Sequence, residues 1–313
     1  MGFSVLLLGA LVFVNGWTDA PNAIATCVGC GVMKMRSASL MAAVMNLLGT
    51  VVAVATGGAV MTGMMNIVSV SDENENLVLC VAMLSVVIWS TIAWYFGLPT
   101  SESHALVSAL IGSALAVAGN INAYEWQKVI IGLLLSVALG GGAGFGFALL
   151  GKELQLREKD TKKALKTASA LMAFSHGAGD GQKFVGVFLM MLSPLQKSEC
   201  EMKIIAVVTV ALLMFLGTSL GGGRIIKTVT KEMTTLEPIT AFFSDLGGAL
   251  CVLVSTFLGF PISTTHSKMT SVMGVAASNG TLNFGSARKM FVAWALTFPV
   301  SFALAYLLTC LLK

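Results

Sequence analysis

Gly97-Leu-Pro-Thr-Ser-Glu-Ser-His104 recurs 162 positions later (266 − 104) as Gly259-Phe-Pro-Ile-Ser-Thr-Thr-His266. The shared pattern is Gly-apolar-Pro-x-Ser-x-Ser/Thr-His, and each copy lies between long apolar stretches. A second pair, Asn15-Gly-Trp-Thr-Asp19-Ala-Pro-Asn22 and His176-Gly-Ala-Gly-Asp180-Gly-Gln-Lys183, has an offset of 161 (180 − 19). The chain is therefore a duplicated unit. Matching polar, helix-breaking motifs in two membrane halves indicate the binding site of a transporter.

The composition places the chain in lipid. Apolar residues make up 56% of its 313 residues and charged residues only 11%, whereas a soluble domain carries about 25% charged residues. A helix needs roughly 20 apolar residues to cross a bilayer, so the length allows about ten crossings. We expect an all-α integral membrane protein whose apolar segments are 3–27, 37–63, 77–96, 104–118, 129–150, 168–193, 204–220, 239–257, 269–278 and 290–312.

The apolar segments fall into two equal groups joined by a strongly hydrophilic stretch. We expect a first repeat at 1–150, a basic cytoplasmic linker at 151–166 and a second repeat at 167–313. The fourth segment of each repeat is short and follows the Pro/Ser/Thr/His motif, which predicts a broken or re-entrant helix. An odd number of crossings in each half makes the two repeats inverted in the membrane, an arrangement that suits alternating access.

The distribution of lysine and arginine predicts the orientation, because cytoplasmic loops are enriched in both residues. With the N-terminus outside, 13 of the 19 basic residues fall on the inner side and four on the outer side, and the opposite orientation reverses this ratio. We therefore expect a multi-pass protein of the cell membrane with both termini outside. The start, Met1-Gly2-Phe3-Ser4, has no positively charged region, so we expect no cleaved signal peptide.

The Pro/Ser/Thr/His motifs predict two helix starts. Proline is favoured in the first turn of a helix, and serine and threonine are good N-cap residues. Free N–H groups at a helix start form an anion site, and two such starts at a repeat interface are suited to an oxyanion. The alternative is that the hydroxyls only cap the backbone. The candidate hydroxyl residues are Ser101, Ser103, Ser263, Thr264 and Thr265.

Asp19 and Asp180 are the candidate cation ligands, because a carboxylate at membrane depth is costly and marks a functional site. Asp19 precedes Pro21 and Asn22, a poor sequence for a continuous helix. Glycines on both sides of Asp180 predict a loosened helix at the matching place. Carboxylate, amide and unwound carbonyl oxygens suit Na⁺, so we expect Na⁺ ligands from Asp19, Asn22 and Asp180. The alternative is a structural pairing of each carboxylate with a lysine or a helix end.

Two lysines and one glutamate fall within or beside the motifs. Lys183 and Lys268 are expected to balance Asp180, Glu102 or a multivalent anion, or else to extend their ammonium groups to the membrane surface. Glu102 replaces the hydroxyl of its repeat mate Thr264. It is a candidate cation ligand, proton carrier or lysine partner.

The histidines of the chain are His104, His176 and His266, and each lies in a motif. We expect them to orient neighbouring groups through hydrogen bonds, with proton relay as the alternative. Asp245 lies in an apolar segment after Ser244 and is a weaker candidate for function.

Several classes of activity are disfavoured. Cys27-Val-Gly-Cys30 has metal spacing but no second ligand pair, so we expect ordinary membrane-helix cysteines. The glycines of 140–146 lie within an apolar span and favour close helix packing. Metalloprotease, serine-nucleophile and Walker sequences are missing, so we expect neither an enzyme nor ATP-driven transport. The net charge of +4 does not indicate nucleic acid as a partner, because the basic residues cluster in loops.

These motifs resemble those of the inorganic phosphate transporter (PiT) family, which has a duplicated Gly-x-Asn-Asp-x-x-Asn-Ala signature and Pro-x-Ser-Thr-Thr-His elements. The resemblance covers essentially the whole chain. It implies secondary uptake of inorganic phosphate coupled to Na⁺ or H⁺, an inverted-repeat core and a homodimer. It also implies that Asp19, Asn22, Asp180, Gln182 and the Ser/Thr groups form the ion and phosphate sites.

The chain departs from this signature where Thr18 and Gly179 replace the asparagine before each aspartate. The leading expectation is Na⁺-coupled phosphate import by alternating access, with Lys183 among the substrate-binding residues. The alternatives are an H⁺-coupled phosphate permease, a sulfate permease and, in a different class, a passive anion channel. A carboxylate beside the anion favours phosphate over sulfate, because phosphate at neutral pH can donate a hydrogen bond.

Overall fold

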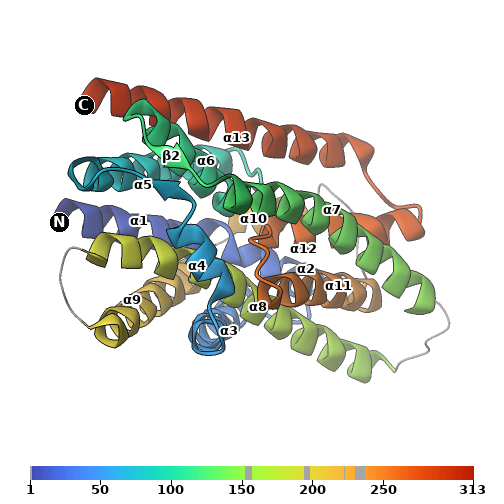
Figure 1. Cartoon of the computed structure of the whole chain (residues 1–313). Coiled ribbons are helices and arrows are strands. Elements are labelled where there is room, and N and C mark those ends of the chain that lie inside the picture. The colour runs from blue at the N-terminus through green and yellow to red at the C-terminus, as the bar shows by residue number, and fades with distance from the viewer. Residues whose placement is uncertain (1, 152–156, 194–197, 222, 230–236) are drawn as a thin grey trace.

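The computed structural model describes residues 2–151, 157–193, 198–221, 223–229 and 237–313. The described chain is almost entirely helical (Figure 1). The first half contains α1 (Gly2–Thr18), η1 (Ala20–Ala23), α2 (Ala25–Gly29), α3 (Met35–Ala55), α4 (Ala59–Met65), β1 (Val68–Ser69), α5 (Asp72–Tyr95), α6 (Glu102–Ala116), β2 (Asn120–Ile121) and α7 (Ala123–Gly151). The second half contains α8 (Glu158–Leu192), α9 (Glu199–Leu220), α10 (Gly223–Lys227), α11 (Pro238–Phe257), α12 (Thr264–Ser278) and α13 (Phe284–Leu312).

Long apolar helices confirm the membrane prediction. Seven helical segments within the described ranges are long and apolar enough to cross a membrane: 2–23, α3, α5, α7, α9, α11 and α13. Each of the ten predicted apolar segments corresponds to one or more of the observed helices. Helix α8 is too polar to join the seven, yet nearly all of its residues from Ala168 to Leu192 are buried. It packs against α3, α4, α9 and α11, so its polar side chains face protein rather than lipid.

The two halves interlock in a symmetric way. Helix α6 of the first half packs against α13 of the second, and α12 of the second half packs against α7 of the first. Likewise α1 packs against α9, while α3 packs against α8. Each half therefore completes the other, as expected for a two-repeat transporter fold. Figure 1 shows α13 lying beside α5 and α6, with the N- and C-terminal ends of the chain at the same end of the bundle.

Glycine allows the closest of these crossings. A Cβ on Gly112 of α6 would lie 2.4 Å from the carbonyl oxygen of Phe302 in α13. A Cβ on Gly274 of α12 would lie 2.2 Å from the carbonyl oxygen of Gly141 in α7. Gly112 and Gly274 are repeat mates, 162 positions apart (274 − 112). The same α7–α12 contact includes Gly144, which supports the packing interpretation of the glycines at 140–146.

The shared spacing of the two Pro/Ser/Thr/His motifs encodes a helix end followed by a helix start. Gly97 and Gly259 have φ angles of 69° and 80°. In each motif the glycine N–H and the next N–H bond back to the preceding helix, as in a Schellman ending. Ser101 and Ser263 are the N-caps that start α6 and α12. The expectation for proline was wrong: Pro99 and Pro261 lie two residues before the caps, in the non-helical connections rather than in the first turn of a helix.

The aspartate motifs differ between the halves. Helix α1 ends at Thr18, and a short 3-10 turn with Pro21 separates it from α2. Helix α8 continues unbroken through Asp180, so the predicted loosening there was wrong. Its glycines serve close packing instead. A Cβ on Gly177 would lie 2.1 Å from the carbonyl oxygen of Asn46 in α3, and this contact holds α8 in a continuous helical path.

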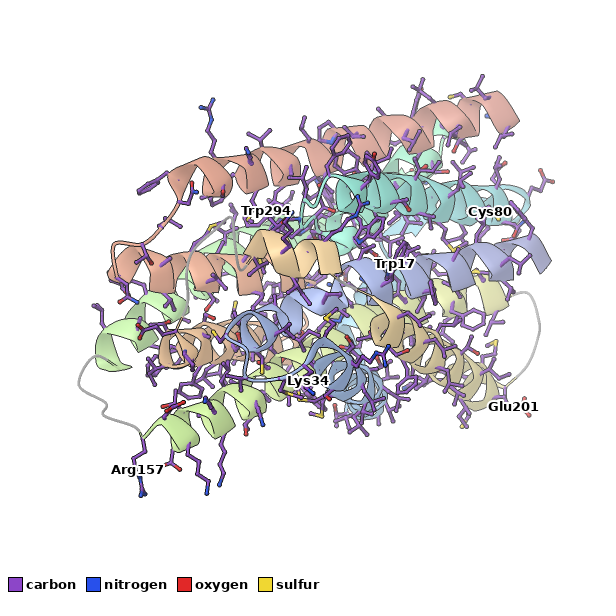
Figure 2. All side chains as sticks on the ribbon, turned by 180° about the vertical axis from the view of Figure 1, so that it is seen from behind. Trp17, Lys34, Cys80, Arg157, Glu201 and Trp294 are labelled. Carbon is purple, nitrogen blue, oxygen red and sulfur yellow. The ribbon has the colours of Figure 1, made fainter. Side chains whose placement is uncertain are left out.

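The charged residues at the start of α8 and those at the start of α9 lie at opposite ends of the bundle. Figure 2 shows Arg157 at one end and Glu201 at the other. Helix α8 begins at Glu158, so part of the predicted linker is helical, whereas 152–156 lie outside the described residues. The repeat boundaries at 150 and 167 stay predictions. At the end distal to Arg157, Val68 pairs with Ile121 in a two-stranded antiparallel sheet. The six cysteines form no disulfide bonds.

Candidate functional site

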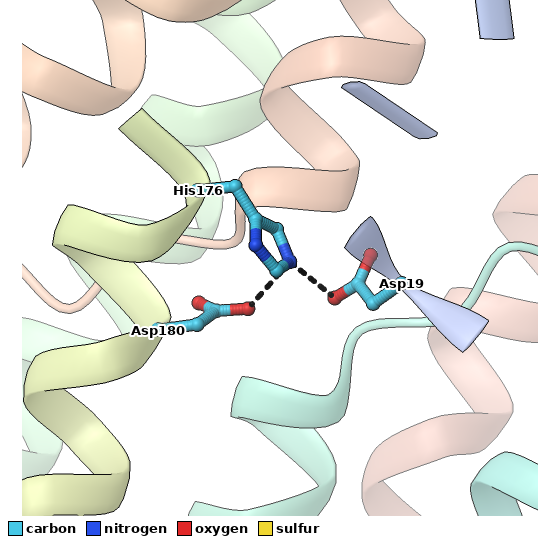
Figure 3. A group of neighbouring side chains, drawn as sticks. All are labelled: Asp19, His176 and Asp180. Atoms are coloured by element: carbon cyan, nitrogen blue, oxygen red, sulfur yellow. Dashed lines mark ion pairs between the residues drawn. The ribbon is translucent and has the colours of Figure 1, made fainter. Parts of the chain in front are cut away.

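Two carboxylates from different halves meet in the interior. Asp19 lies at the break after α1, and Asp180 lies in the middle of α8. The imidazole of His176 lies between them (Figure 3). Its Nε2 atom is 3.8 Å from Asp19 Oδ2 and 3.4 Å from Asp180 Oδ2. All three side chains are buried. Their ligand atoms lie within 4.8 Å of one another, a spacing that can hold a cation.

The orientation of His176 sets the electrostatics of this group. Nδ1 lies 3.1 Å from Asn46 Oδ1, which accepts a hydrogen bond while the Asn46 amide group donates to Thr218. In a neutral imidazole whose Nδ1 donates, Nε2 carries a lone pair. That lone pair faces two carboxylates, so the arrangement favours a cation or a proton between them.

Reciprocal hydrogen bonds connect the halves at the site. Ser103 in the first turn of α6 donates to Asp180 Oδ1 at 3.0 Å. Its repeat mate, Thr265 in the first turn of α12, donates to Asp19 Oδ1. Each half-helix start therefore bonds the carboxylate of the opposite half. Thr264 donates to Asp180 Oδ2 at 3.2 Å, so the predicted meeting of hydroxyls and carboxylates is present.

The remaining motif hydroxyls cap helices. Ser101 Oγ accepts from the backbone N–H of His104 at 3.3 Å. Ser263 Oγ accepts from the backbone N–H of His266 at 3.1 Å. For these two serines the backbone-capping alternative describes the structure, because each hydroxyl oxygen accepts one N–H group of the first turn of its helix.

Asn22 and Asn15 complete the surroundings of the carboxylates. Asn22 donates to Asp19 Oδ1 at 2.8 Å, and Asn15 donates to Asp180 Oδ2 at 3.4 Å. Within the described part of the chain, the amide oxygens of both asparagines are buried without a hydrogen-bond partner. Such oxygens are unusual in a protein interior and need a partner such as an ordered water molecule or a cation.

Glu102 lies beside this group. Its Oε1 accepts a hydrogen bond from Thr18, the residue that replaces the family asparagine. Its Oε2 has no hydrogen-bond partner among the described residues. Glu102, Thr18 and Asp19 line a cavity of about 10 Å³, which also contacts Ser90 and Trp94. A cavity of that size holds about one water molecule, so it has no room for a phosphate ion in this structure.

The two motif lysines have different partners. Lys183 Nζ lies 2.8 Å from Asp180 Oδ1 and donates to Ser103 and to the carbonyl oxygen of Ile262, each at 2.6 Å. Lys268 instead contacts Asp245, away from Asp19 and Asp180. Both lysines are buried, so the alternative that they extend to the membrane surface was wrong. Three carboxyl groups, Asp19, Glu102 and Asp180, thus have one ammonium group in hydrogen-bond range.

Three predicted residues occupy other positions. The rings of His104 and His266 pack together with centroids 4.9 Å apart. Neither ring forms a hydrogen bond to any described residue, so the expectation of orientation through hydrogen bonds was wrong for both. Gln182 Oε1 accepts from the backbone N–H groups of Val60 and Met61 at the start of α4, so the structure places Gln182 apart from the carboxylates.

Sequence reasoning missed Asn15, Asn46, Ser90 and Trp94 as residues of the site. Asn15 belongs to the first aspartate motif and matches His176 in the repeat, which was an available signal. Asn46 and Ser90 are polar residues within apolar segments, where a polar side chain costs free energy and points to a role. Trp94 carried no distinguishing signal, because tryptophan is common near membrane surfaces.

Comparisons with known proteins show the family to which the chain is related. The model of the phosphate transporter family matches residues 15–169 and 161–305. A Bacillus subtilis (strain 168) protein named "Probable low-affinity inorganic phosphate transporter" is 35% identical, with 93% of this chain and 91% of that protein covered. A Rhizobium meliloti (strain 1021) protein of the same name is 32% identical, with 92% and 89% covered.

A solved structure named "The sodium-dependent phosphate transporter" has the same fold. The TM-score is 0.87 at 22% identity, with 100% of this chain and 99% of that chain covered. The family model matches both halves of this chain, and the resemblance of its motifs to the family is confirmed. The chain therefore belongs to the phosphate transporter family, whose members are membrane transporters rather than enzymes.

Proposed function

We propose that this protein imports inorganic phosphate by symport with Na⁺ through alternating access. The observation that carries the proposal is the reciprocal bonding at the repeat interface. Ser103 of α6 bonds Asp180, and Thr265 of α12 bonds Asp19. One compact centre thus combines carboxylates for cations with two half-helix starts for an anion, at the place where inverted repeats move against each other.

Unpaired oxygens favour cation binding at this centre. The amide oxygens of Asn15 and Asn22 lie on side chains that already donate to Asp180 and Asp19. Each aspartate thus has an amide oxygen close by with no partner among the described residues. Na⁺ binds carboxylate and carbonyl oxygens. We infer Na⁺ ligands at Asp19 with Asn22 and at Asp180 with Asn15.

Phosphate binding is favoured at the starts of α6 and α12. Free backbone N–H groups and the positive end of the helix dipole attract anions there. Ser103, Thr264 and Thr265 supply hydroxyl donors from the same turns, but these hydroxyls donate to Asp180 and Asp19 in this structure. Phosphate needs the same donors, and the carboxylates repel it.

Coupling follows from this competition. Na⁺ bound to Asp19 and Asp180 neutralises their charge and weakens their hold on the hydroxyl donors. The hydroxyls can then turn to phosphate. Binding of the anion thus requires the cation, which is the condition for symport. The names of the curated relatives support phosphate as substrate, and the name of the solved structure supports Na⁺ as the coupling ion.

A proton-coupled version of the same transport is favoured by Glu102. This carboxyl is 2% exposed, and its Oε2 atom has no partner among the described residues. A buried unpaired carboxylate is costly, and protonation removes the charge. In that case the coupling ion is a proton bound to Glu102 rather than Na⁺.

Uptake by the purified protein in liposomes distinguishes these possibilities. We expect phosphate uptake to stop when Na⁺ is replaced by choline at constant pH. Uptake should persist when the proton gradient is collapsed while the Na⁺ gradient is kept. Sulfate should compete much more weakly than phosphate. The opposite ion dependence would move the coupling role to Glu102, and passive phosphate flux without any gradient coupling would indicate a channel.

Asp19→Asn tests the centre most cleanly, because no lysine of the described residues lies within ion-pair range of Asp19, whereas Asp180 pairs with Lys183. We expect loss of Na⁺-coupled uptake with the protein still folded. Asp180→Asn leaves a buried ammonium group unpaired, a change that typically costs about 3–5 kcal/mol of stability. Asp180→Asn combined with Lys183→Met is therefore its matched variant. Wild-type uptake with unchanged Na⁺ dependence in Asp19→Asn would remove that residue from the site.

A further inference from the structure

A second buried ion pair lies outside the proposed transport centre. Asp245 of α11 and Lys268 of α12 form it, and both side chains are 0% exposed. Lys268 lies one turn after Thr264 and Thr265, the residues that contact Asp180 and Asp19. The ion pair therefore involves the same half-helix, α12, that carries Thr264 and Thr265, but it connects this helix to Asp245 rather than to Asp19 or Asp180.

Hydroxyl groups surround the carboxylate of Asp245. Thr26 of α2 donates to Oδ1 at 2.7 Å, and Ser169 of α8 donates to Oδ2 at 2.5 Å. Lys268 Nζ also lies 3.3 Å from Thr26 Oγ1. Four helices, α2, α8, α11 and α12, thus meet at one carboxylate. Ser244 completes the group with a hydroxyl 3.3 Å from Oδ1.

The repeat mates of this cluster are apolar. Asp245 and Lys268 match Met83 and Leu106 at an offset of 162 (245 − 83, 268 − 106). Thr26 and Ser169 match Val187 and Leu8 at an offset of 161 (187 − 26, 169 − 8). All four mates are buried in the larger apolar core. The same packing position is thus filled by apolar side chains in the other half, and the architecture itself does not require charge there.

The energetic cost of burying Asp245 and Lys268 indicates that this ion pair has a function. Replacing a buried ion pair by well-packed apolar residues is often neutral or stabilising, and an ionisable residue at membrane depth indicates function. A carboxylate with hydroxyl oxygens is also the ligand set of a hard cation. In this structure the cation among those oxygens is the ammonium group of Lys268.

We propose that Asp245, Thr26 and Ser169 form a cation site whose resident cation is the covalently attached ammonium of Lys268. Because this charge cannot dissociate, the site fixes the start of α12 against α2 and α8 without taking up an ion from solution. The cluster therefore contributes no ion to the transport stoichiometry. This assignment does not depend on which substrate or ion the central site carries.

Thermal unfolding in detergent tests the proposal without measuring transport. Lys268→Ala removes the ammonium group and leaves the carboxylate and hydroxyl oxygens. We expect this variant to recruit Na⁺ in its place, so its Tm should rise more steeply with Na⁺ than that of the wild type, by roughly 3 °C for each tenfold increase above the dissociation constant. Choline replaces Na⁺ at constant ionic strength. Binding of radioactive Na⁺ should show one more site than in the wild type.

The double variant Lys268→Ala with Asp245→Asn is the matched control. It removes both charges, so we expect it to fold and to lack the added Na⁺ dependence. A Lys268→Ala variant that folds only at high Na⁺, while the double variant folds at low Na⁺, also supports the proposal. Equal Na⁺ dependence of Lys268→Ala and wild type would overturn it. Failure of both variants to fold at any Na⁺ concentration would equally overturn it, because the pair would then serve packing.

Discussion

At the scale of single residues, the motif hydroxyls divide into two kinds. Ser101 and Ser263 accept backbone N–H groups and start their helices. Ser103 and Thr265 lie two positions further and donate to carboxylates of the opposite half. The alternation follows from helix geometry, because the N-cap side chain folds back on the first turn whereas the N2 side chain points away from it.

Ser263→Ala and Thr265→Val should therefore have different effects. We expect Ser263→Ala to lower stability by about 1 kcal/mol through loss of the cap, with little change in the KM for phosphate. Thr265→Val keeps the shape but removes the donor to Asp19. Hydrogen bonds to charged groups contribute about 1.5–3 kcal/mol, so the KM or the half-saturating Na⁺ concentration should rise roughly tenfold or more.

Thermal unfolding and initial uptake rates measure both effects. Ser101→Ala and Ser103→Ala are the equivalent variants of the first half, so they repeat the same comparison of a capping with a donating residue. Equal changes of KM in the capping and the donating variants would contradict the division of roles.

At the scale of helices, the two aspartate motifs behave differently despite their common origin. Proline at position 21 lacks an N–H donor and follows the end of α1. The matching stretch of α8 has glycines and no proline, and α3 packs directly on it. Glycine permits a bend but does not impose one, so tertiary contact decides the outcome. Asp19 is thus presented by a break and Asp180 by a continuous helix.

Close helix crossings give a prediction for Gly274. A Cβ there would lie 2.2 Å from the carbonyl oxygen of Gly141 and must push α12 from α7. We expect Gly274→Ala to lower stability by about 1–3 kcal/mol, as overpacking does. Gly142→Ala is the matched control, because nothing lies within 4 Å of a Cβ at that position of α7.

The yield of folded protein after membrane extraction and its Tm measure this difference. The control should match the wild type or exceed it slightly, because alanine favours helix over glycine by about 1 kcal/mol. A Gly274→Ala variant as stable as Gly142→Ala would show that the α7–α12 crossing has room to adjust.

At the scale of the whole molecule, the two halves hold each other in place. The first half supplies Asp19 and the Ser103 hydroxyl that binds Asp180. The second half supplies Asp180 and the Thr265 hydroxyl that binds Asp19. The interlocked packing of α6 with α13 and α7 with α12 brings these groups together. The contacts of Ser103 with Asp180 and of Thr265 with Asp19 both cross between the halves, so the site is assembled only when the two halves pack together.

The orientation of this assembly is a prediction from charge, and Cys200 tests it. Cys200 is exposed at the start of α9, on the side that we expect to face outward. In a Cys310→Ser background, a membrane-impermeant maleimide should label Cys200 in intact cells. A cysteine at the exposed position Lys162, with Cys200→Ser, should be labelled only after permeabilisation, because Lys162 lies in the basic segment. The reverse pattern of labelling would place both termini inside.

The sequence by itself determined the membrane class, the duplication and the helical segments, and it singled out most of the side chains that meet around Asp19 and Asp180. These features depend on composition and on local pattern: apolar length, repeat spacing, glycine at a helix end and serine at a helix start. The pairing of Asp19 and Asp180 across halves was expected only in outline, and the partners of Ser103, Thr265 and Glu102 were not expected.

Only the tertiary structure decided which hydroxyls cap a helix and which bind a carboxylate, that α8 stays continuous, and that Lys268 belongs to Asp245 while Lys183 belongs to Asp180. Those choices are made between helices far apart in the sequence. A lysine reaches any carboxylate within the length of its side chain, and spacing along one chain does not say which helix lies beside it. Burial against α2, α8 and α11 leaves Asp245 as the partner of Lys268. Contact with α6 and α8 leaves Asp180 as the partner of Lys183.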